Sequence, residues 1–215
     1  MPRASNRRAG EPRVEARGSL GGGPSAGYSL VELLVVVAIV VALLIAAIPT
    51  LDRAADTADA AAAARYLAAV VARARLDAVR RQRTVAVRFS TGTPRVFSVV
   101  VDGDGDGVNA ADIASGTDRI TRADDRIEDH FPRARLGIGG PVTGIDGGSA
   151  LTAGDDPVRF GAGDTISLTA MGTATSGTAY LTSRAGVQFA VRLSGITGRT
   201  RVLRYDHGQA SWRSY

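Results

Sequence analysis

The carboxylate of Glu32 lies inside a long apolar run and is the first side chain of this sequence to which chemistry can be assigned. The run, 28–48, otherwise contains only Tyr, Ser, Leu, Val, Ile and Ala. An ionisable residue in such a segment costs roughly 2.5–3.5 kcal/mol at the centre of a bilayer and less near its edge. Glu32 is therefore a candidate for pairing with a positive group on a neighbouring molecule.

A second candidate site is an acidic loop that could bind calcium. Asp102, Asp104 and Asp106 alternate with glycine, and Asp112 follows six residues later. Calcium prefers several hard oxygen ligands, and this spacing matches the first half of an EF-hand loop. The match is incomplete, because the twelfth position is Ile113 rather than Glu. The alternative is a solvated, glycine-rich hairpin loop, and we expect no other cofactor.

Arginines gather beside aromatic residues near the end of the sequence. The members of this group are Arg184, Arg192, Arg199, Arg201, Arg204 and Arg213, with Tyr205, Trp212 and Tyr215 among them. Guanidinium groups neutralise phosphates and stack on bases, so Arg199 and Arg201 are candidate contacts to DNA. The alternative is that alternate arginines form the solvent-exposed face of a strand.

Other chemistry finds little support in the sequence. The chain has no cysteine, which excludes disulfides, thiolate metal sites and a cysteine nucleophile. The two histidines, His130 and His207, lack the spacing of metal ligands. No strand–turn–helix motif presents a serine nucleophile or a phosphate-binding glycine loop. We predict that the protein is not an enzyme; a membrane-anchored surface hydrolase, one alternative, would lack its catalytic residues.

The apolar run is long enough to cross a bilayer. Its 21 residues would form a helix of about 30 Å, the thickness of the hydrocarbon core. Five arginines and two glutamates precede the run, whereas Asp52, Asp56 and Asp59 follow it. The positive-inside rule then places the N-terminus in the cytoplasm and the chain after Pro49 outside. A cleaved signal peptide, whose apolar core is usually shorter, and a plain membrane anchor are the alternatives.

Helical periodicity continues beyond Pro49, which can bend a helix without ending it. No Gly or Pro occurs between Leu51 and Arg83, and apolar residues recur there near helical spacing. This stripe consists of Leu51, Ala55, Ala58, Ala62, Tyr66, Ala69, Leu76 and Val79. We predict one helix over 28–83 that packs the stripe on a sheet. Mixed Asp and Arg on its other faces argue against a nucleic-acid-binding helix.

From Thr84 onward the period of the apolar residues changes from 3.6 to 2, which is typical of strands. Strands are predicted at 84–90, 95–101, 119–122, 133–138, 157–160, 165–169, 178–183, 187–193, 199–205 and 209–214. The stretch 137–163 is rich in Gly, Asp and Pro and is expected to contain long connections. A helix followed by antiparallel strands predicts an α+β fold.

Residues 27–32, Gly-Tyr-Ser-Leu-Val-Glu, resemble the class III signal of type IV prepilins and pseudopilins, whose usual form is Gly-Phe-Thr-Leu-Ile-Glu. The resemblance implies cleavage after Gly27 by the prepilin peptidase and N-methylation of Tyr28. Glu32 and Pro49 then fall at the family's positions for the acid and for the helix-bending proline. The new α-amine of one subunit can neutralise Glu32 of another, since a paired charge is cheaper in lipid than a lone one. Tyr28 departs from the usual Phe but keeps an aromatic side chain.

The globular part resembles the GspH/FimT group of minor pseudopilins and minor pilins. The residues that carry this resemblance are Phe160-Gly-Ala-Gly163, 172–181, Thr197-Gly-Arg-Thr-Arg201 and Trp212. It implies a pilin-like fold with a cleaved leader (1–27), a transmembrane part of the helix (28–48), a periplasmic part (49–83) and a β-rich globular domain (84–215).

The two resemblances together imply a function. The expected protein is a minor pseudopilin of a type II secretion system, held in the inner membrane and assembled with other pseudopilins into a periplasmic pseudopilus for protein export. The alternative is a minor type IV pilin that binds DNA for uptake through Arg199 and Arg201, a Gly-Arg-x-Arg element of that group.

Overall fold

The computed structural model describes residues 27–145, 149–161 and 163–215. The chain forms two compact units, one that ends at Ile45 and one from Ala46 to Tyr215. Apart from Gly27, the predicted leader lies outside the described residues, so its cleavage remains a prediction.

A single long helix, α1 (Leu30–Arg81), confirms the predicted helix to within two residues at each end. Ser29 begins it as a cap, since the Ser29 hydroxyl oxygen accepts the N–H of Val31 at 3.3 Å. Pro49 lies inside the helix without ending it. At the other end Gln82 adopts a left-handed conformation with φ of 55°, which stops the helix.

In the first unit the side chains of α1 are uncovered. Large apolar residues from Leu30 to Ile45 are about half to three-quarters exposed. By length and composition, α1 is the one helix in the described part of the chain that could cross a membrane.

The second unit contains two antiparallel sheets, whereas the sequence predicted one. The first has the order β3-β2-β1-β6 and is built from β1 (Val85–Phe89), β2 (Phe97–Val101), β3 (Arg119–Asp125) and β6 (Thr165–Leu168). The second has the order β10-β9-β8-β7-β4, and β5 also pairs with β7. Its strands are β4 (Ala134–Leu136), β5 (Val158–Phe160), β7 (Gly177–Ser183), β8 (Gln188–Leu193), β9 (Thr200–Asp206) and β10 (Ser211–Ser214).

These strands confirm every predicted strand, with bounds that differ by at most three residues. The division into two sheets was not predictable from local patterns, because β1 pairs with β6, more than seventy residues later. Two short helices were also not predicted: α2 (Ala110–Ser115) and α3 (Ile127–His130). Asn109 caps α2 by accepting the N–H groups of Ala111 and Asp112.

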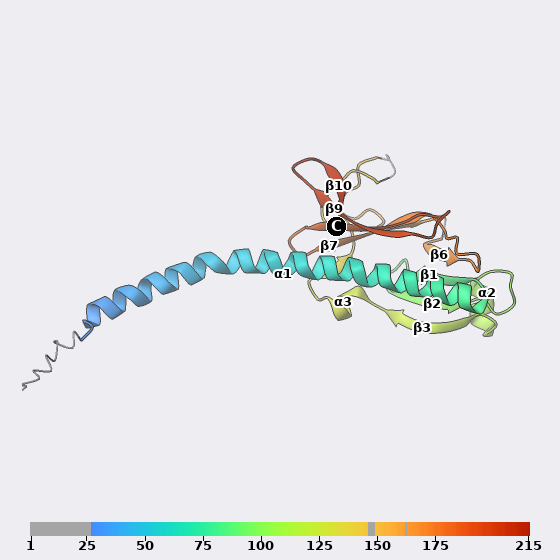
Figure 1. Ribbon diagram of the computed structural model, residues 1–215, viewed down its shortest axis with the longest axis horizontal. Coiled ribbons are helices and arrows are strands. Elements are labelled where there is room, and N and C mark those ends of the chain that lie inside the picture. Colours follow the sequence, from blue (N-terminus) through green and yellow to red (C-terminus); the bar gives the residue numbers. More distant parts are fainter. Residues whose placement is uncertain (1–26, 146–148, 162) are drawn as a thin grey trace, which may run out of the picture. The chain divides into compact units, whose positions relative to one another are not determined.

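One hydrophobic core joins α1 to both sheets. Its largest fully buried side chains include Leu67 of α1, Phe97 of β2 and Phe189 of β8. In the second unit α1 shares this core with residues of β1, β2, β7 and β8, and Figure 1 draws β3 below the helix and β9 above it. The core therefore lies where the helix meets the two sheets.

The predicted apolar stripe on α1 was wrong for most of its residues, although Tyr66 does pack against the core. The buried face consists of Asp56, Ala60, Ala61, Ala63, Ala64, Leu67, Val70, Val71, Ala74 and Ala78. From the predicted stripe, Leu51 and Leu76 are 68% and 63% exposed. The reason is that alanine occurs all round this helix, so a spacing near 3.6 fits more than one face. Small residues are buried because they let the helix approach the sheets closely.

A second, smaller cluster covers the outer face of the six-stranded sheet. Ile138, Val142 and Leu151, from the predicted connection region, pack over Tyr180 and Tyr205. The indole N–H of Trp212 donates to the backbone oxygen of Thr143 at 2.7 Å and holds this segment to β10. Both faces of β7 are consequently covered, which explains why all of its residues are buried.

Candidate functional site

The N-terminal candidate site lies on uncovered helix. Tyr28 is 84% exposed, and Glu32 lies in the first turn of α1, where the helix dipole favours a negative charge. Within the described residues no ion pair involves Glu32, so any positive partner must come from another molecule or from residues before Gly27. The structure thus presents Glu32 on a helix surface that is open to a neighbour.

The acidic loop brings its carboxylates together. Oxygen atoms of Asp102, Asp104 and Asp106 lie within 4.8 Å of one another, and so do those of Asp104, Asp112 and Asp118. Asp118 was not predicted, since it follows the loop motif and reaches the cluster only because α2 reverses the chain. Repulsion from Asp104 is the largest of the effects that raise the pKa of Asp106.

Backbone hydrogen bonds fix the shape of this loop. The Asp102 carboxylate accepts the N–H groups of Gly105 at 2.6 Å and Gly107 at 3.1 Å. The Asp118 carboxylate accepts those of Gly103 and Asn109, each at 3.0 Å. A Cβ on Gly103 would lie 1.9 Å from the backbone oxygen of Thr117, so the loop requires glycine there.

These carboxylates fit a hard cation in their chemistry. Each carboxylate oxygen has a second lone pair after it accepts one N–H, and Asp104 and Asp106 are exposed to solvent. Such a loop would hold calcium through Asp102, Asp104, Asp106 and Asp112, with Asp118 added. The backbone bonds also explain the loop's conformation without an ion, so calcium binding stays a prediction.

The C-terminal arginines do not form one patch. Arg201 of β9 lies opposite Arg192 of β8, which in turn lies opposite Thr178 of β7, and Thr178 lies opposite Arg159 of β5. Arg159, Arg192 and Arg201 therefore form a row across the outer face of the six-stranded sheet, which we call the arginine row. The Arg192 guanidinium donates to the Thr178 hydroxyl at 3.1 Å.

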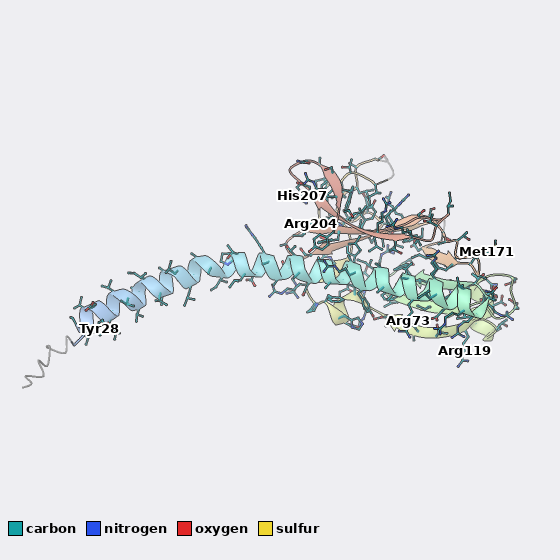
Figure 2. All side chains as sticks on the ribbon, in the orientation of Figure 1. Tyr28, Arg73, Arg119, Met171, Arg204 and His207 are labelled. Carbon is teal, nitrogen blue, oxygen red and sulfur yellow. The ribbon has the colours of Figure 1, made fainter. Side chains whose placement is uncertain are left out.

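The remaining arginines lie elsewhere. Arg204 and Arg213 face each other across β9 and β10, on the opposite side of the sheet from Arg201 because side chains alternate along a strand. Arg213 pairs with Asp206 at 3.3 Å. Arg199 is exposed just before β9 begins. Figure 2 labels Arg204 with His207 beside the β9–β10 hairpin.

A polar network that sequence reasoning missed connects α1 to β3 and α3. The hydroxyl of Tyr66 donates to Asp125 at 2.5 Å, and the His130 ring nitrogen Nε2 lies 2.8 Å from the same carboxylate. Arg122 pairs with Asp125 at 3.2 Å and lies over the Tyr66 ring. No local signal could have found this network, because Tyr66 and Asp125 lie 59 residues apart.

The network changes the acidity of its members. Burial alone would raise the pKa of Asp125, but hydrogen bonds from Tyr66 and His130 and the charge of Arg122 outweigh burial and hold this pKa below its ordinary value. Burial and the hydrogen bond to Asp125 raise the pKa of Tyr66. Ionised Asp125 and neutral Tyr66 are therefore the forms that stabilise the contact between helix and sheet.

A second missed contact involves an acid on the buried face of α1. Asp56 is 7% exposed and pairs with Arg133 at 3.2 Å, and Arg133 also reaches Asp52 at 3.3 Å. Hydrogen bonds to Asp56 and Asp52 raise the pKa of Arg133. Both contacts hold the segment before β4 to the helix, which is a structural role.

Comparison with protein-family models, with curated proteins and with solved structures gives no match to this chain. What the structure establishes is an α+β fold with two antiparallel sheets and an N-terminal helix long and apolar enough to cross a membrane. The prepilin-type and GspH/FimT resemblances remain hypotheses that depend on the sequence motifs.

Proposed function

We propose that this protein is a structural subunit of a membrane-assembled filament, a minor pseudopilin of a type II protein secretion system. The observation that carries the proposal is the first half of α1, where an apolar surface with one carboxylate, Glu32, has no cover within its own unit. A surface of this kind is stable in lipid or against the same surface of neighbouring subunits.

The motif at 27–32 is the basis for proposing that the chain is cleaved before assembly. Cleavage after Gly27 leaves Tyr28 as the first residue, and its α-amine is a positive group close to Glu32 in the chain. When a subunit joins the filament, Glu32 pairs with the α-amine of a neighbour. The carboxylate then acts in assembly, by favouring one register between subunits, and not in catalysis.

The second unit suits the same role. Its core joins the second half of α1 to both sheets, so this half of the helix and the β-rich part would enter a filament together. In the proposed topology this unit lies in the periplasm and presents its loops and sheet faces to other pseudopilins or to the exported protein.

Mass spectrometry of the mature N-terminus tests this proposal. The full chain is produced in membranes of a host with a prepilin peptidase and, as a control, of a host without one. A methylated Tyr28 start, present only with the peptidase and abolished by Gly27→Leu, supports the proposal. An intact Met1 start in both hosts would contradict it and leave a plain membrane anchor.

The arginine row favours a second candidate function, a minor pilin that binds DNA. Arg192 and Arg201 are cross-strand partners, so their Cβ atoms lie about 5 Å apart on the same face of the sheet. Arg199, exposed at the start of β9, would extend the same basic surface. A row of this kind can follow a phosphate backbone.

A mobility-shift assay with duplex DNA at several salt concentrations tests the second function. The double variant Arg192→Gln/Arg201→Gln should weaken binding and lower the salt slope by about 2, roughly one unit for each phosphate that is no longer neutralised. The matched control is Arg204→Gln/Arg213→Gln on the opposite face. Equal weakening in the two double variants, or binding that does not change with salt, would exclude this function.

A further inference from the structure

A groove lies between α1 and the edge strand β3 in the second unit. It consists of two cavities of about 420 and 340 Å³ that share Arg81 and Thr121 as lining residues. Val70 and Ala74 of α1 and Val99 of β2 contribute apolar surface to the larger cavity. We call this region the helix–edge groove.

Three arginines on the helix–edge groove have no countercharge in the described part of the chain. Arg73 and Arg81 come from α1, Arg119 comes from β3, and all three are exposed and form no ion pair or side-chain hydrogen bond there. Arg122 also lines the groove but is paired with Asp125. In Figure 2 the labelled Arg73 and Arg119 both lie on the side of α1 along which β3 runs.

Two acids line the groove without neutralising these arginines. Asp77 lies between Arg73 and Arg81 on α1 and pairs with neither of them. Asp102 is 1% exposed, and its carboxylate is occupied by two backbone N–H groups of the acidic loop. The groove therefore presents an excess of positive charge beside an apolar floor.

The strand that borders the groove has a free edge. β3 is the terminal strand of its sheet, is seven residues long, and has only β2 as a partner in the described chain. Such an edge presents unpaired N–H and C=O groups that another strand can use. Arg119 and Arg122 lie opposite Val101 and Val99, so their side chains face the helix and the groove.

We propose that the helix–edge groove binds an extended acidic segment of another polypeptide, which adds as a strand to β3. Arg73 and Arg81 are eight residues apart on α1, or about 12 Å along the axis. Two acids four residues apart on an extended strand are separated by about 13 Å. A segment with this spacing matches both helix arginines, while Arg119 reaches the same segment from β3.

The geometry favours a polypeptide over a nucleic acid. The free edge offers both donors and acceptors, and a phosphodiester backbone carries only acceptors, so the β3 carbonyl groups would stay unpaired. A second copy of this chain is also a poor partner. Its own acidic run, Asp102–Asp112, is folded into a loop in which the carboxylates of Asp102 and Asp104 accept backbone N–H groups. The occupant is therefore a different protein with an acidic, strand-forming segment.

Fluorescence anisotropy with the full chain in nonionic detergent tests this proposal. The probe is a fluorescein-labelled heptapeptide in which glutamate alternates with valine. We expect saturable binding that weakens about tenfold or more in Arg73→Gln/Arg119→Gln, since two positive charges that face the peptide are removed. The matched control, Arg204→Gln/Arg213→Gln on the other sheet, should bind as the parent does.

A second peptide separates strand addition from simple charge attraction. It has the same number of glutamates, but proline replaces valine and removes the N–H groups that pair with β3. The proposal requires this peptide to bind at least about tenfold more weakly than the first. Equal binding of the two peptides, no binding of the first at millimolar concentration, or displacement by a duplex DNA at lower concentration would each overturn the proposal.

Discussion

Replacing Glu32 by leucine is expected to separate membrane insertion from assembly. α1 begins at Leu30, so Glu32 lies only about 3 Å along the helix axis from the first helical residue. Near this edge the cost of inserting a lone carboxylate is below the roughly 2.5–3.5 kcal/mol of the bilayer centre. Glu32→Leu removes that cost, so the variant should insert at least as well as the parent.

Assembly should change in the opposite direction. Pairing of Glu32 with a neighbour's α-amine recovers at most the cost of the lone charge, which we take as about 1–2 kcal/mol at this depth. Removing the pair corresponds to about 5–30-fold in the affinity between subunits. Glu32→Gln keeps the size and polarity of the side chain and should weaken assembly as much as Glu32→Leu, whereas Glu32→Asp should keep part of the pairing.

Photo-crosslinking in membranes measures assembly, and insertion can be measured in the same samples. A benzoylphenylalanine in place of Val36, which is 52% exposed and one turn beyond Glu32, captures any neighbouring helix. Extraction of the membranes at alkaline pH reports insertion in the same samples. If Glu32→Leu gives as many adducts as the parent at equal membrane levels, pairing is not the role of this carboxylate. If insertion falls instead, Glu32 acts before assembly.

Three further predictions concern the second unit, each measured on the full chain in detergent. Leu67→Ala, in the core between α1 and both sheets, should lower the free energy of unfolding by about 2–5 kcal/mol and the melting temperature by roughly 5–15 °C, whereas Leu76→Ala on the exposed face should change little. Because its pKa is lowered in the fold, Asp125 contributes stability that is present above its unfolded pKa of about 3.9 and lost as the pH falls through the folded value. Tyr66→Phe removes one hydrogen bond that lowers this pKa, so urea unfolding should show a lower free energy of unfolding at neutral pH and a smaller loss on acidification, with the difference from the parent vanishing at low pH; an unchanged acid profile would exclude this coupling. Calcium titration should give heat that Asp104→Ala abolishes and Asp129→Ala leaves intact, and no heat at millimolar calcium would leave a solvated loop as the explanation.

Local patterns in the sequence were sufficient for α1 and for the strands, but not for the short helices α2 and α3. The change of apolar period at Thr84 located the end of α1 and the start of β1, because burial on one face imposes a period of 3.6 on a helix and of 2 on a strand. The same patterns did not identify the buried face of α1, because the apolar spacing fits more than one face of this helix. Alanines surround α1 between Ala54 and Ala78, so only the sheets that it contacts decide which of them are buried.

The candidate sites show the same difference between residues that are close in sequence and residues that only the fold brings together. The acidic loop was recognisable because Asp102, Asp104 and Asp106 are close in sequence, and a chain with alternating glycines can bring such carboxylates together. Asp118 joins them only through the turn at α2. The helix–edge groove left no sequence signal, since Arg73 and Arg119 are 46 positions apart and line the same groove only because the edge strand β3 lies beside α1.

Sheet register, more than position in the sequence, decides which charges act together. Arg201 and Arg204 are three residues apart but lie on opposite faces of β9, whereas Arg201 and Arg192 are nine residues apart and are direct partners. An anion that spans both strands would contact the two arginines of this pair at once. A scan that replaces arginines in sequence order would mix residues from the two faces of the sheet. Variants grouped by face, Arg192 with Arg201 and Arg204 with Arg213, measure each surface separately.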